Sequence, residues 1–269
     1  MDAVEMLHLE KVAQRLVAVQ RHPRVAKLLL DEFVREAGEE ERGRAAELAR
    51  TAPTTVQRVH RGAVALGIAR FCKFYHVESD YYNWSLEHRA ARLAAPSIDH
   101  LCKTVVFENT RWKDDGLDVY DMRFARFYAV IVQYTDKINP AKLNQFAWGE
   151  LGGQKRSKRD YNLRVAEEPV ALALTGLGRM GVVPIGAGIV GSDGAVASDG
   201  GRAADNGADP ASIAGLRTPA LQMSVILTSN VVALAPRIMF LGAGHIDWKI
   251  AVPIDVFRRN TACVVADLA

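Results

Sequence analysis

Apolar residues recur every three or four positions along the first part of the chain. This spacing is that of one face of a helix, so it predicts amphipathic helices. The pattern pauses at His22-Pro23, resumes up to about residue 33, and returns in a third helical stretch at about 54–68. The apolar positions of the first two helices are Met6, Leu9, Val12, Leu16 and Val19, then Val25, Leu28, Leu29 and Phe33. We therefore expect an all-helical extension over residues 1–67.

From about residue 68 short apolar runs alternate with helical stretches, which predicts a mixed α/β domain over residues 68–269. Residues 127–134 are almost entirely apolar or aromatic and rich in β-branched side chains, as expected of a central strand. Asn139-Pro140 should begin a helix, with Asn139 as its cap. The other expected strands are 71–77, 100–108, 222–228, 237–241, 246–251 and 262–266, the helices are 85–93, 139–151 and 167–174, and 182–185 is a loop or short strand.

Residues 187–218 interrupt this pattern. They are rich in Gly, Ala and Asp and contain no aromatic residue. Such a composition buries too little apolar surface to offset the entropy lost on ordering. We expect a mobile surface insertion, either a tolerated one or a functional lid.

Composition sets outer limits on function. The chain has 269 residues, 49% of them hydrophobic and 24% charged, as in soluble globular proteins. No apolar run approaches the roughly 20 residues of a membrane-spanning helix, and the N-terminal segment does not resemble a signal peptide. We expect a cytoplasmic protein without a membrane partner. The three cysteines, Cys72, Cys102 and Cys263, are too widely spaced for a metal knuckle and are expected to be buried thiols.

Positive charge is concentrated in one short stretch. The net charge is only +3, but residues 154–164 hold five basic side chains: Lys155, Arg156, Lys158, Arg159 and Arg164. Such a stretch can bind the phosphate backbone of a nucleic acid, and it can equally be a solvated loop.

Three motifs occur in the order found in one known family. They are the strand His100-Leu-Cys-Lys103-Thr104-Val-Val-Phe107, the loop Gly181-Val-Val-Pro184-Ile-Gly186 preceded by Thr175-Gly176, and the turn Gly242-Ala-Gly244-His245-Ile-Asp247. Together they resemble the YbaK-like and prolyl-tRNA-synthetase-associated editing domains. A eukaryotic branch of that family is similar in further stretches, Ser79 to Trp84, Ser97 to Lys103, Val132 to Thr135 and Tyr161 to Arg164. The resemblance covers about residues 70–266.

The resemblance implies a mixed-sheet editing domain that hydrolyses the ester between a wrong amino acid and its tRNA. Its implied catalytic residues are Lys103 and Asp247. Its implied substrate-binding residues are Thr104, Gly181, Val182, Val183, Pro184, Ile185, Gly186, Gly242 and Gly244, with the basic stretch holding tRNA. We expect no metal and no cofactor, because an activated ester needs only orientation and stabilisation of the oxyanion. The sequence has no G-x-S-x-G elbow, Cys/His signature or His-rich metal spacing.

Several alternatives remain open at this point. Lys103 can hold a carbonyl oxygen or a phosphodiester, or can merely extend to solvent from a sheet. Asp247 can orient Lys103 or cap a turn. The aromatic group Tyr81, Tyr82 and Trp84 can stack on the terminal adenine or pack against the sheet.

The glycine-rich loop departs from the bacterial pattern, because Met180 stands in place of a glycine and Val183 in place of a hydroxyl residue. This puts the substrate class in doubt. The leading hypothesis is a deacylase acting in trans on aminoacylated tRNA. The alternative is a non-catalytic module that binds tRNA or docks to an aminoacyl-tRNA synthetase or multi-synthetase assembly through residues 1–67. We expect Lys103, the 181–186 loop and Asp247 to converge on one cleft.

Overall fold

A computed structural model describes residues 15–41, 43–113, 124–151, 157–177, 182–185 and 223–268. Several sequence predictions fall outside these ranges. They are the 187–218 insertion, the loop glycines Gly181 and Gly186, and the basic residues Lys155 and Arg156.

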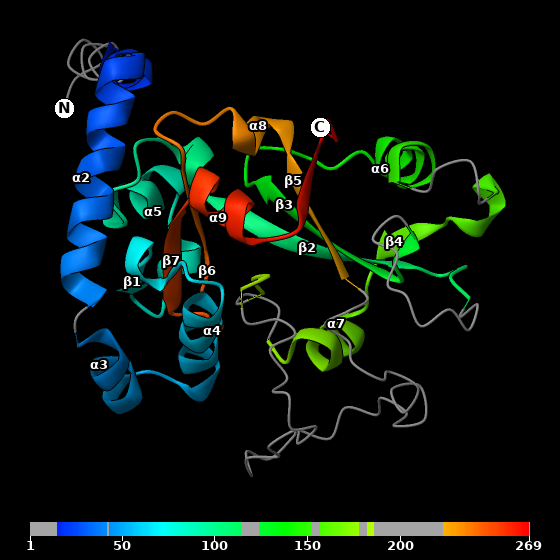
Figure 1. The fold of residues 1–269 in the computed structure, drawn as a ribbon, viewed down its shortest axis with the longest axis horizontal. Helices are drawn as coiled ribbons and strands as arrows, with labels where there is room; N and C mark the ends of the chain where they lie inside the picture. The colour runs from blue at the N-terminus through cyan, green and yellow to red at the C-terminus, as the bar shows by residue number, and fades with distance from the viewer. Residues whose placement is uncertain are drawn as a thin grey trace.

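The N-terminal part is helical, as predicted. The described part of a first helix ends at Arg21, and His22 forms a bend. Helix α2 (Pro23–Glu41) begins with the proline, which suits this position because N–H groups in the first turn have no partner within the helix. Gly43 adopts φ 94° and redirects the chain into α3 (Arg44–Thr51), and α4 (Thr54–Ala65) follows Pro53. Figure 1 shows α2 along one side of the molecule, with α3 and α4 below it.

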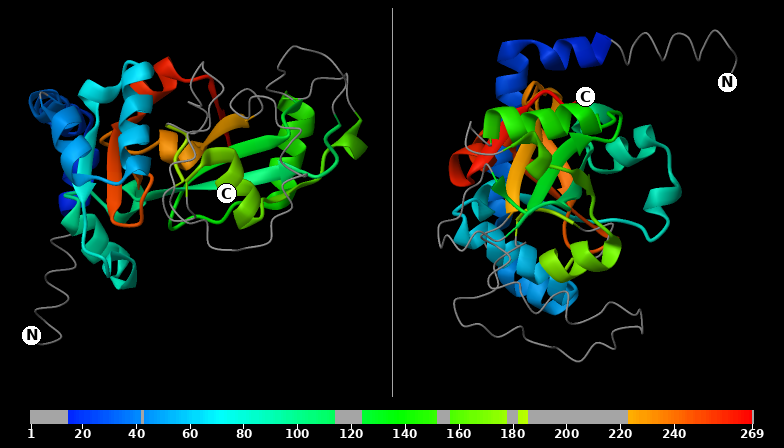
Figure 2. Two further views of the ribbon diagram at one scale, coloured as in Figure 1. Left: turned by 90° about the horizontal axis from the view of Figure 1, so that it is seen from below. Right: turned by 90° about the vertical axis from the view of Figure 1, so that its right-hand side faces the viewer.

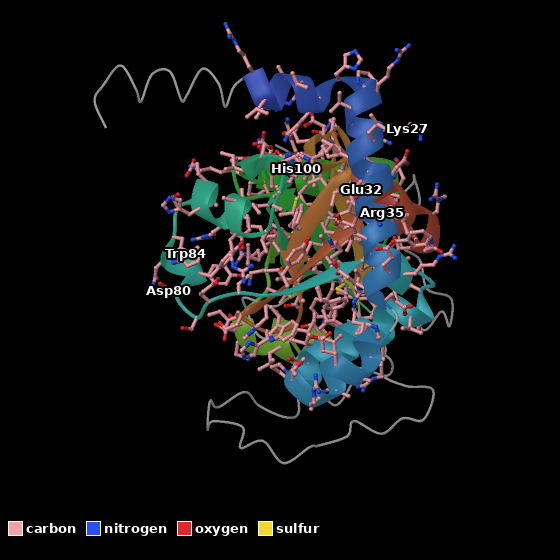
Figure 3. All side chains as sticks on the ribbon, turned by 90° about the vertical axis from the view of Figure 1, so that its left-hand side faces the viewer. Lys27, Glu32, Arg35, Asp80, Trp84 and His100 are labelled. Carbon is pink, nitrogen blue, oxygen red and sulfur yellow. The ribbon has the colours of Figure 1, made fainter. Side chains whose placement is uncertain are left out.

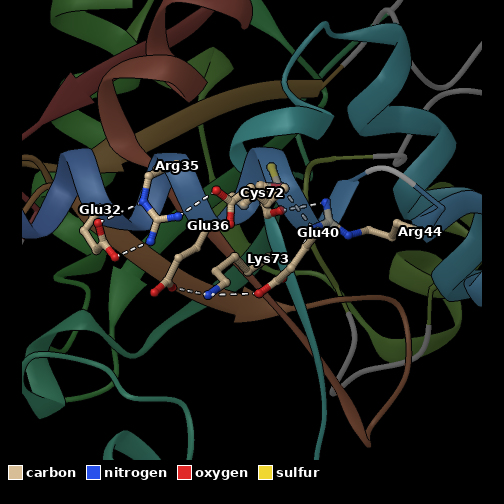
Figure 4. A network of polar contacts seen from close by, with 9 residues as sticks. Glu32, Arg35, Glu36, Glu40, Arg44, Cys72 and Lys73 are labelled. Carbon is tan, nitrogen blue, oxygen red and sulfur yellow. Dashed lines mark hydrogen bonds and ion pairs between the residues drawn. The ribbon is translucent and has the colours of Figure 1, made fainter.

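Polar contacts attach α2 to the first strand, β1 (Lys73–His76). Lys73 Nζ lies 2.7 Å from Glu36 and 3.2 Å from Glu40, both on α2 (Figure 4). The buried Arg44 guanidinium donates to the Cys72 carbonyl at 2.8 Å and the Ala37 carbonyl at 3.3 Å. Charged groups seldom lie in a protein interior without such partners, so this network fixes the helices on the sheet.

The strands form two sheets that meet at a bridge. The five-stranded sheet has the order β4-β2-β3-β5-β8, with β2 antiparallel to β3 and β4, and with β5 parallel to β3 and β8. The three-stranded sheet has the antiparallel order β1-β7-β6. A parallel bridge from Leu101 to Phe240 joins the start of β2 to β6. The strands are β2 (Cys102–Asn109), β3 (Phe127–Gln133), β4 (Leu163–Val165), β5 (Met223–Thr228), β6 (Ile238–Gly242), β7 (Trp248–Pro253) and β8 (Cys263–Ala266).

Helices cover both faces of the five-stranded sheet. Figure 2 shows α6 (Pro140–Phe146) and α7 (Glu168–Thr175) on opposite sides of it. Leu143 and Phe146 of α6 pack with Tyr128 and Val130, whereas Leu174 of α7 packs with Phe127. The remaining helices with described bounds are α5 (Leu86–Arg92), α8 (Ser229–Val232) and α9 (Ile254–Asn260).

Helix α4 shares the largest core with the sheets. Val56, Val59 and Ala63 are fully buried in one cluster with residues of β6, β7 and α9. Arg58 of α4 also donates to the carbonyls of Thr175 and Gly176 at the end of α7. The domain boundary at residues 67 and 68 stays a prediction, and α4, which precedes it, packs into the core of the domain that follows.

The fold class predicted from sequence is confirmed: the chain is α/β, with a mixed sheet and N-terminal helices. The fully buried strand β3 lies in the centre of its five-stranded sheet, as its apolar sequence predicts. One detail differs: the helix after Asn139 ends as an α-helix at Phe146 and continues as a π-helical turn (Ala147–Leu151). Residues 182–185 form a loop without strand pairing, which is one of the two predicted alternatives.

Candidate functional site

A cavity of about 670 Å³ opens along one edge of β2. On this edge β4 pairs only with residues 107–109 and β6 only with Leu101. In the described chain, no strand fills the gap between them, and the cavity occupies it. Its lining includes residues 102–106 of β2, Tyr82, Arg89, Tyr134, Ala166, Glu168, Ala171, Leu177, Val182 and Gly242.

Lys103 and Thr104 reach this cavity from opposite faces of β2, because neighbouring residues of a strand alternate in direction. Lys103 Nζ lies 5.4 Å from the centre of the Tyr134 ring. Thr104 pairs with Ile131, and its Oγ1 is buried without a hydrogen-bond partner in the described chain. The cavity wraps around the open edge, so both side chains line it.

Only some of the described residues of the glycine-rich loop, 182–185, line the cavity. Val182 lines it, on the α7 side. Val183 and Ile185 are fully buried in the core shared with α4, and Pro184 lies between them. Their side chains therefore anchor the loop, and Lys103 and Val182 meet in one cavity although they belong to different faces of the sheet.

The late glycine-rich turn (residues 242–247) also has only some of its residues at the cavity. Gly242 lines the cavity, but Gly244 lies against α4, where a Cβ atom would come within 2.8 Å of the Thr55 carbonyl oxygen. Asp247 does not line the cavity. Its N–H donates to His245 Nδ1 and its carbonyl accepts from Val77, and among the described residues no hydrogen bond or ion pair joins it to Lys103.

A cluster of tyrosines and cations lies at one side of the cavity. Tyr82, Arg89 and Tyr134 line the cavity, whereas Tyr81 and Lys249 line a smaller pocket that shares these three residues. The Arg89 guanidinium lies over the rings of Tyr81 and Tyr82 at 5.7 and 5.2 Å, and Lys249 Nζ lies 5.0 and 4.5 Å from the same rings. The side chains of Tyr82 and Tyr134 hydrogen-bond to each other. These rings pack against protein cations, so of the two roles left open for the aromatic group the structure shows packing for Tyr81 and Tyr82. In Figure 3, Asp80 and Trp84 lie at the edge of the molecule.

Arg89 and Lys249 are not predicted from the sequence. Arg89 is one of several charged residues on an ordinary amphipathic helix, and Lys249 is one polar residue in an apolar strand. A lysine between Trp248 and Ile250 is the one available signal, because a strand buried on both faces rarely holds a charge without a reason.

Cys102 and His100, two residue types that often take part in catalysis, have structural surroundings here. Burial raises the pKa of the Cys102 thiol far above its usual range, so the thiol lining the cavity stays protonated. His100 is buried, to the side of α2 in the view of Figure 3, within 3.0 Å of Ser97 Oγ and of the Pro236 carbonyl oxygen, and burial lowers its pKa. These contacts give His100 a hydrogen-bonding role in the core.

The described members of the basic stretch lie on β4 and on the turn that precedes it. Lys158 and Arg159 are exposed on a short 3-10 turn whose start is capped by Ser157, and Lys158 Nζ lies 5.9 Å from the Trp148 ring. Arg111 donates to the Arg159 carbonyl and adds a cation to the same surface. Arg164 is exposed on β4.

Metal ligation and membrane insertion are two further properties that side-chain arrangement and helix composition can reveal. Within the described ranges, no group of three or more His, Cys, Asp or Glu side chains is arranged to hold a metal ion. None of the helices described there has both the length and the apolar character needed to cross a membrane.

Comparison with known proteins supports the fold. No family model matches the sequence, and no curated protein matches it either. Among solved structures, a candidate trans-editing enzyme for prolyl tRNA synthetase is similar, with a TM-score of 0.52 and 14% identity over 80% of this chain and 97% of that one. A scaffold protein from computational epitope grafting is similar with a TM-score of 0.50 and 13% identity over the same shares. At these identities the likeness shows the fold alone.

Proposed function

We propose that the chain is an aminoacyl-tRNA deacylase that hydrolyses the ester of mischarged tRNA in trans. One observation carries the proposal. The cavity brings together a residue from each of the three motifs on which the family resemblance rests: Lys103 with Thr104, Val182, and Gly242. The similar fold of a candidate trans-editing enzyme supports it.

The proposed chemistry needs one cation, hydrogen-bond donors and a water molecule. Water attacks the ester carbonyl carbon, the bond to the ribose oxygen breaks, and that oxygen leaves with a proton. Lys103 would stabilise the negative charge that develops on the carbonyl oxygen. The Thr104 hydroxyl, which lacks a partner in the described chain, would orient the water or the ester. No metal or cofactor is needed, because the ammonium supplies the positive charge.

The proposed partners follow from the same assignment. Aminoacylated tRNA is the proposed substrate, with Lys155, Arg156, Lys158, Arg159 and Arg164 holding its backbone in the cytoplasm. A synthetase or synthetase assembly is the proposed partner of residues 1–67. Leu16, Val19 and Leu28 support that docking role, since more than half of each side chain is exposed.

Deacylation of a panel of aminoacylated tRNAs tests the proposal. Wild type should release amino acid from at least one tRNA, and Lys103→Ala should lower the rate about 100-fold or more, as removal of an oxyanion donor does. Lys142→Ala, a surface change on α6, is the control and should keep full activity. If wild type binds tRNA but deacylates none of the panel, the non-catalytic binding module becomes the better description.

A further inference from the structure

Lys249 is a buried cation without an ion-pair partner in the described chain. Its side chain lies on β7 and the residue is only 4% exposed. Its Nζ donates to the carbonyls of Ile246 at 2.5 Å and Trp248 at 3.4 Å, and no described carboxylate lies within ion-pair distance. Lys73 on the neighbouring strand shows the usual arrangement, with two glutamates around it. A lysine buried this way costs free energy unless a counter-charge arrives.

Arg89 directs a second cation toward the same place. Its Nε donates to the Trp84 carbonyl at 3.0 Å and its Nη2 to the Tyr82 carbonyl. These two bonds fix the guanidinium beside Tyr82, on the lining of the cavity. Arg89 also has no ion pair in the described chain, so two cations without ion-pair partners lie on one small pocket.

The groups around Lys249 do not cancel this charge. Tyr75 faces it from β1, Tyr81 and Tyr82 from the segment before α5, and Arg89 from α5. Asp247 attracts the ammonium from two residues away without contacting it. The one carboxylate on the described cavity lining is Glu168, which lies on α7. The region around Arg89 and Lys249 is therefore positive.

We propose that Arg89, on the cavity lining, and Lys249, in the small pocket behind it, form an anion-binding subsite, and that its ligand is the phosphate group of a nucleotide. A second, small pocket of about 10 Å³ lies between Tyr82, Arg89 and Lys249. It has room for about one water molecule. Arg89 thus contacts the phosphate directly, whereas Lys249 acts through a water and through its charge in a poorly screened interior.

Phosphate fits better than a carboxylate, and this step rests on the proposed function. In an aminoacyl ester the carboxyl group is esterified and carries no charge. The anions nearest to it are the phosphodiesters of the RNA 3′ end. The cavity, at about 670 Å³, also has the size of sites for ligands as large as a nucleotide.

Calorimetric titration with adenosine 5′-monophosphate, adenosine and inorganic phosphate tests the subsite. Wild type should bind the monophosphate at least about tenfold more tightly than adenosine, which corresponds to one charge-assisted contact. Arg89→Gln and Lys249→Met should each remove most of that preference and leave adenosine binding unchanged. Arg89→Lys, which keeps the charge, should retain part of it. Weak binding of inorganic phosphate would show that the nucleoside adds affinity.

Arg92→Gln is the matched control. Arg92 lies on the same helix but forms an ion pair with Glu78 at 2.9 Å, and it does not line the cavity. It should bind all three probes as wild type does. Equal affinity of wild type for the monophosphate and adenosine would overturn the subsite, as would variants that keep the full preference.

The pH profile gives a test that does not depend on a variant folding. Burial lowers the pKa of Lys249 to about 8. The monophosphate stays a dianion above pH 7, because its second pKa is about 6. Its affinity for wild type should therefore fall between pH 7 and pH 9, while adenosine binding stays level. A flat profile for the monophosphate would also overturn the assignment.

Failure of this inference and failure of the proposed function look different. If wild type deacylates a tRNA but binds adenosine 5′-monophosphate no more tightly than adenosine, the subsite is wrong and the proposed activity stands. If the preference for the monophosphate depends on Arg89 and Lys249 but no tRNA is deacylated, the subsite stands and the proposed activity is wrong.

Discussion

Three lysines of this chain show how much the same side chain depends on its surroundings. Lys73 is paired with two glutamates of α2, Lys103 lies over the Tyr134 ring at the cavity edge, and Lys249 is buried beside two tyrosine rings. Each directly follows an apolar or aromatic residue, so local pattern does not separate them. Of the three, only Lys103 is predicted from the sequence, through its motif.

Gly244 shows the same dependence for a residue without a side chain. Its φ is +91°, a conformation that other residues rarely adopt, and a Cβ there would lie 2.8 Å from the Thr55 carbonyl oxygen. The family resemblance implies a substrate-binding role. The structure places it at the contact between the β6–β7 turn and α4.

We predict that Gly244→Ala destabilises the protein more than Gly43→Ala does. Both glycines have φ above 90°, so both variants should lose about 1–2 kcal/mol from backbone strain. Gly43 has nothing within 4 Å of its added Cβ, whereas at Gly244 the backbone of α4 must shift. Urea unfolding of both variants measures the difference. Equal destabilisation would mean that α4 moves aside at no cost.

At the scale of elements, α4 decides how far the domain extends. Its residues Val56, Val59 and Ala63 are fully buried with β6, β7 and α9. An amphipathic helix at this position is visible in the sequence, but its partner is not, because the apolar stripe fits any apolar surface.

We predict that a chain starting at residue 68 does not unfold cooperatively, whereas one starting at Pro23 does so at nearly the wild-type temperature. The longer deletion removes α4 and exposes its core partners, and each buried valine alone contributes about 1.5–3 kcal/mol. The smaller deletion removes a helix whose described residues are largely exposed. Thermal melting by circular dichroism compares them. A cooperative transition in the chain that starts at residue 68 would show that residues 68–269 form an independent domain.

At the scale of the whole molecule, the basic surface and the cavity lie at different places along the same sheet. Lys158 and Arg159 lie on the turn before β4, and the cavity lies where β4 stops pairing with β2. Under the proposed function, the stem of the tRNA lies on the first and its 3′ end in the second. The two sites should then respond differently to salt.

We predict that replacing Lys155, Arg156, Lys158 and Arg159 by alanine weakens binding to all tRNAs about equally. The slope of log affinity against log salt should flatten by about 0.9 for each phosphate of a duplex stem that the variant no longer neutralises. Lys103→Ala, the comparison, should reduce turnover and leave that slope nearly intact, because it is assigned to the reacting end. Unchanged binding by the quadruple variant would show that the basic stretch is only a solvated loop.

The sequence by itself determined the elements and their class. Helices at the N-terminus, the buried strand β3 and the cap at Asn139 were all readable, because periodicity and capping are local properties. The tertiary structure alone decided which residues meet. It placed Gly242 at the cavity and Gly244 two residues later against α4, placed Asp247 away from Lys103, and brought Arg89 and Lys249 to one small pocket from distant parts of the chain. Such pairings depend on how the sheets and helices pack, and no local pattern encodes the distance between two segments far apart in the chain.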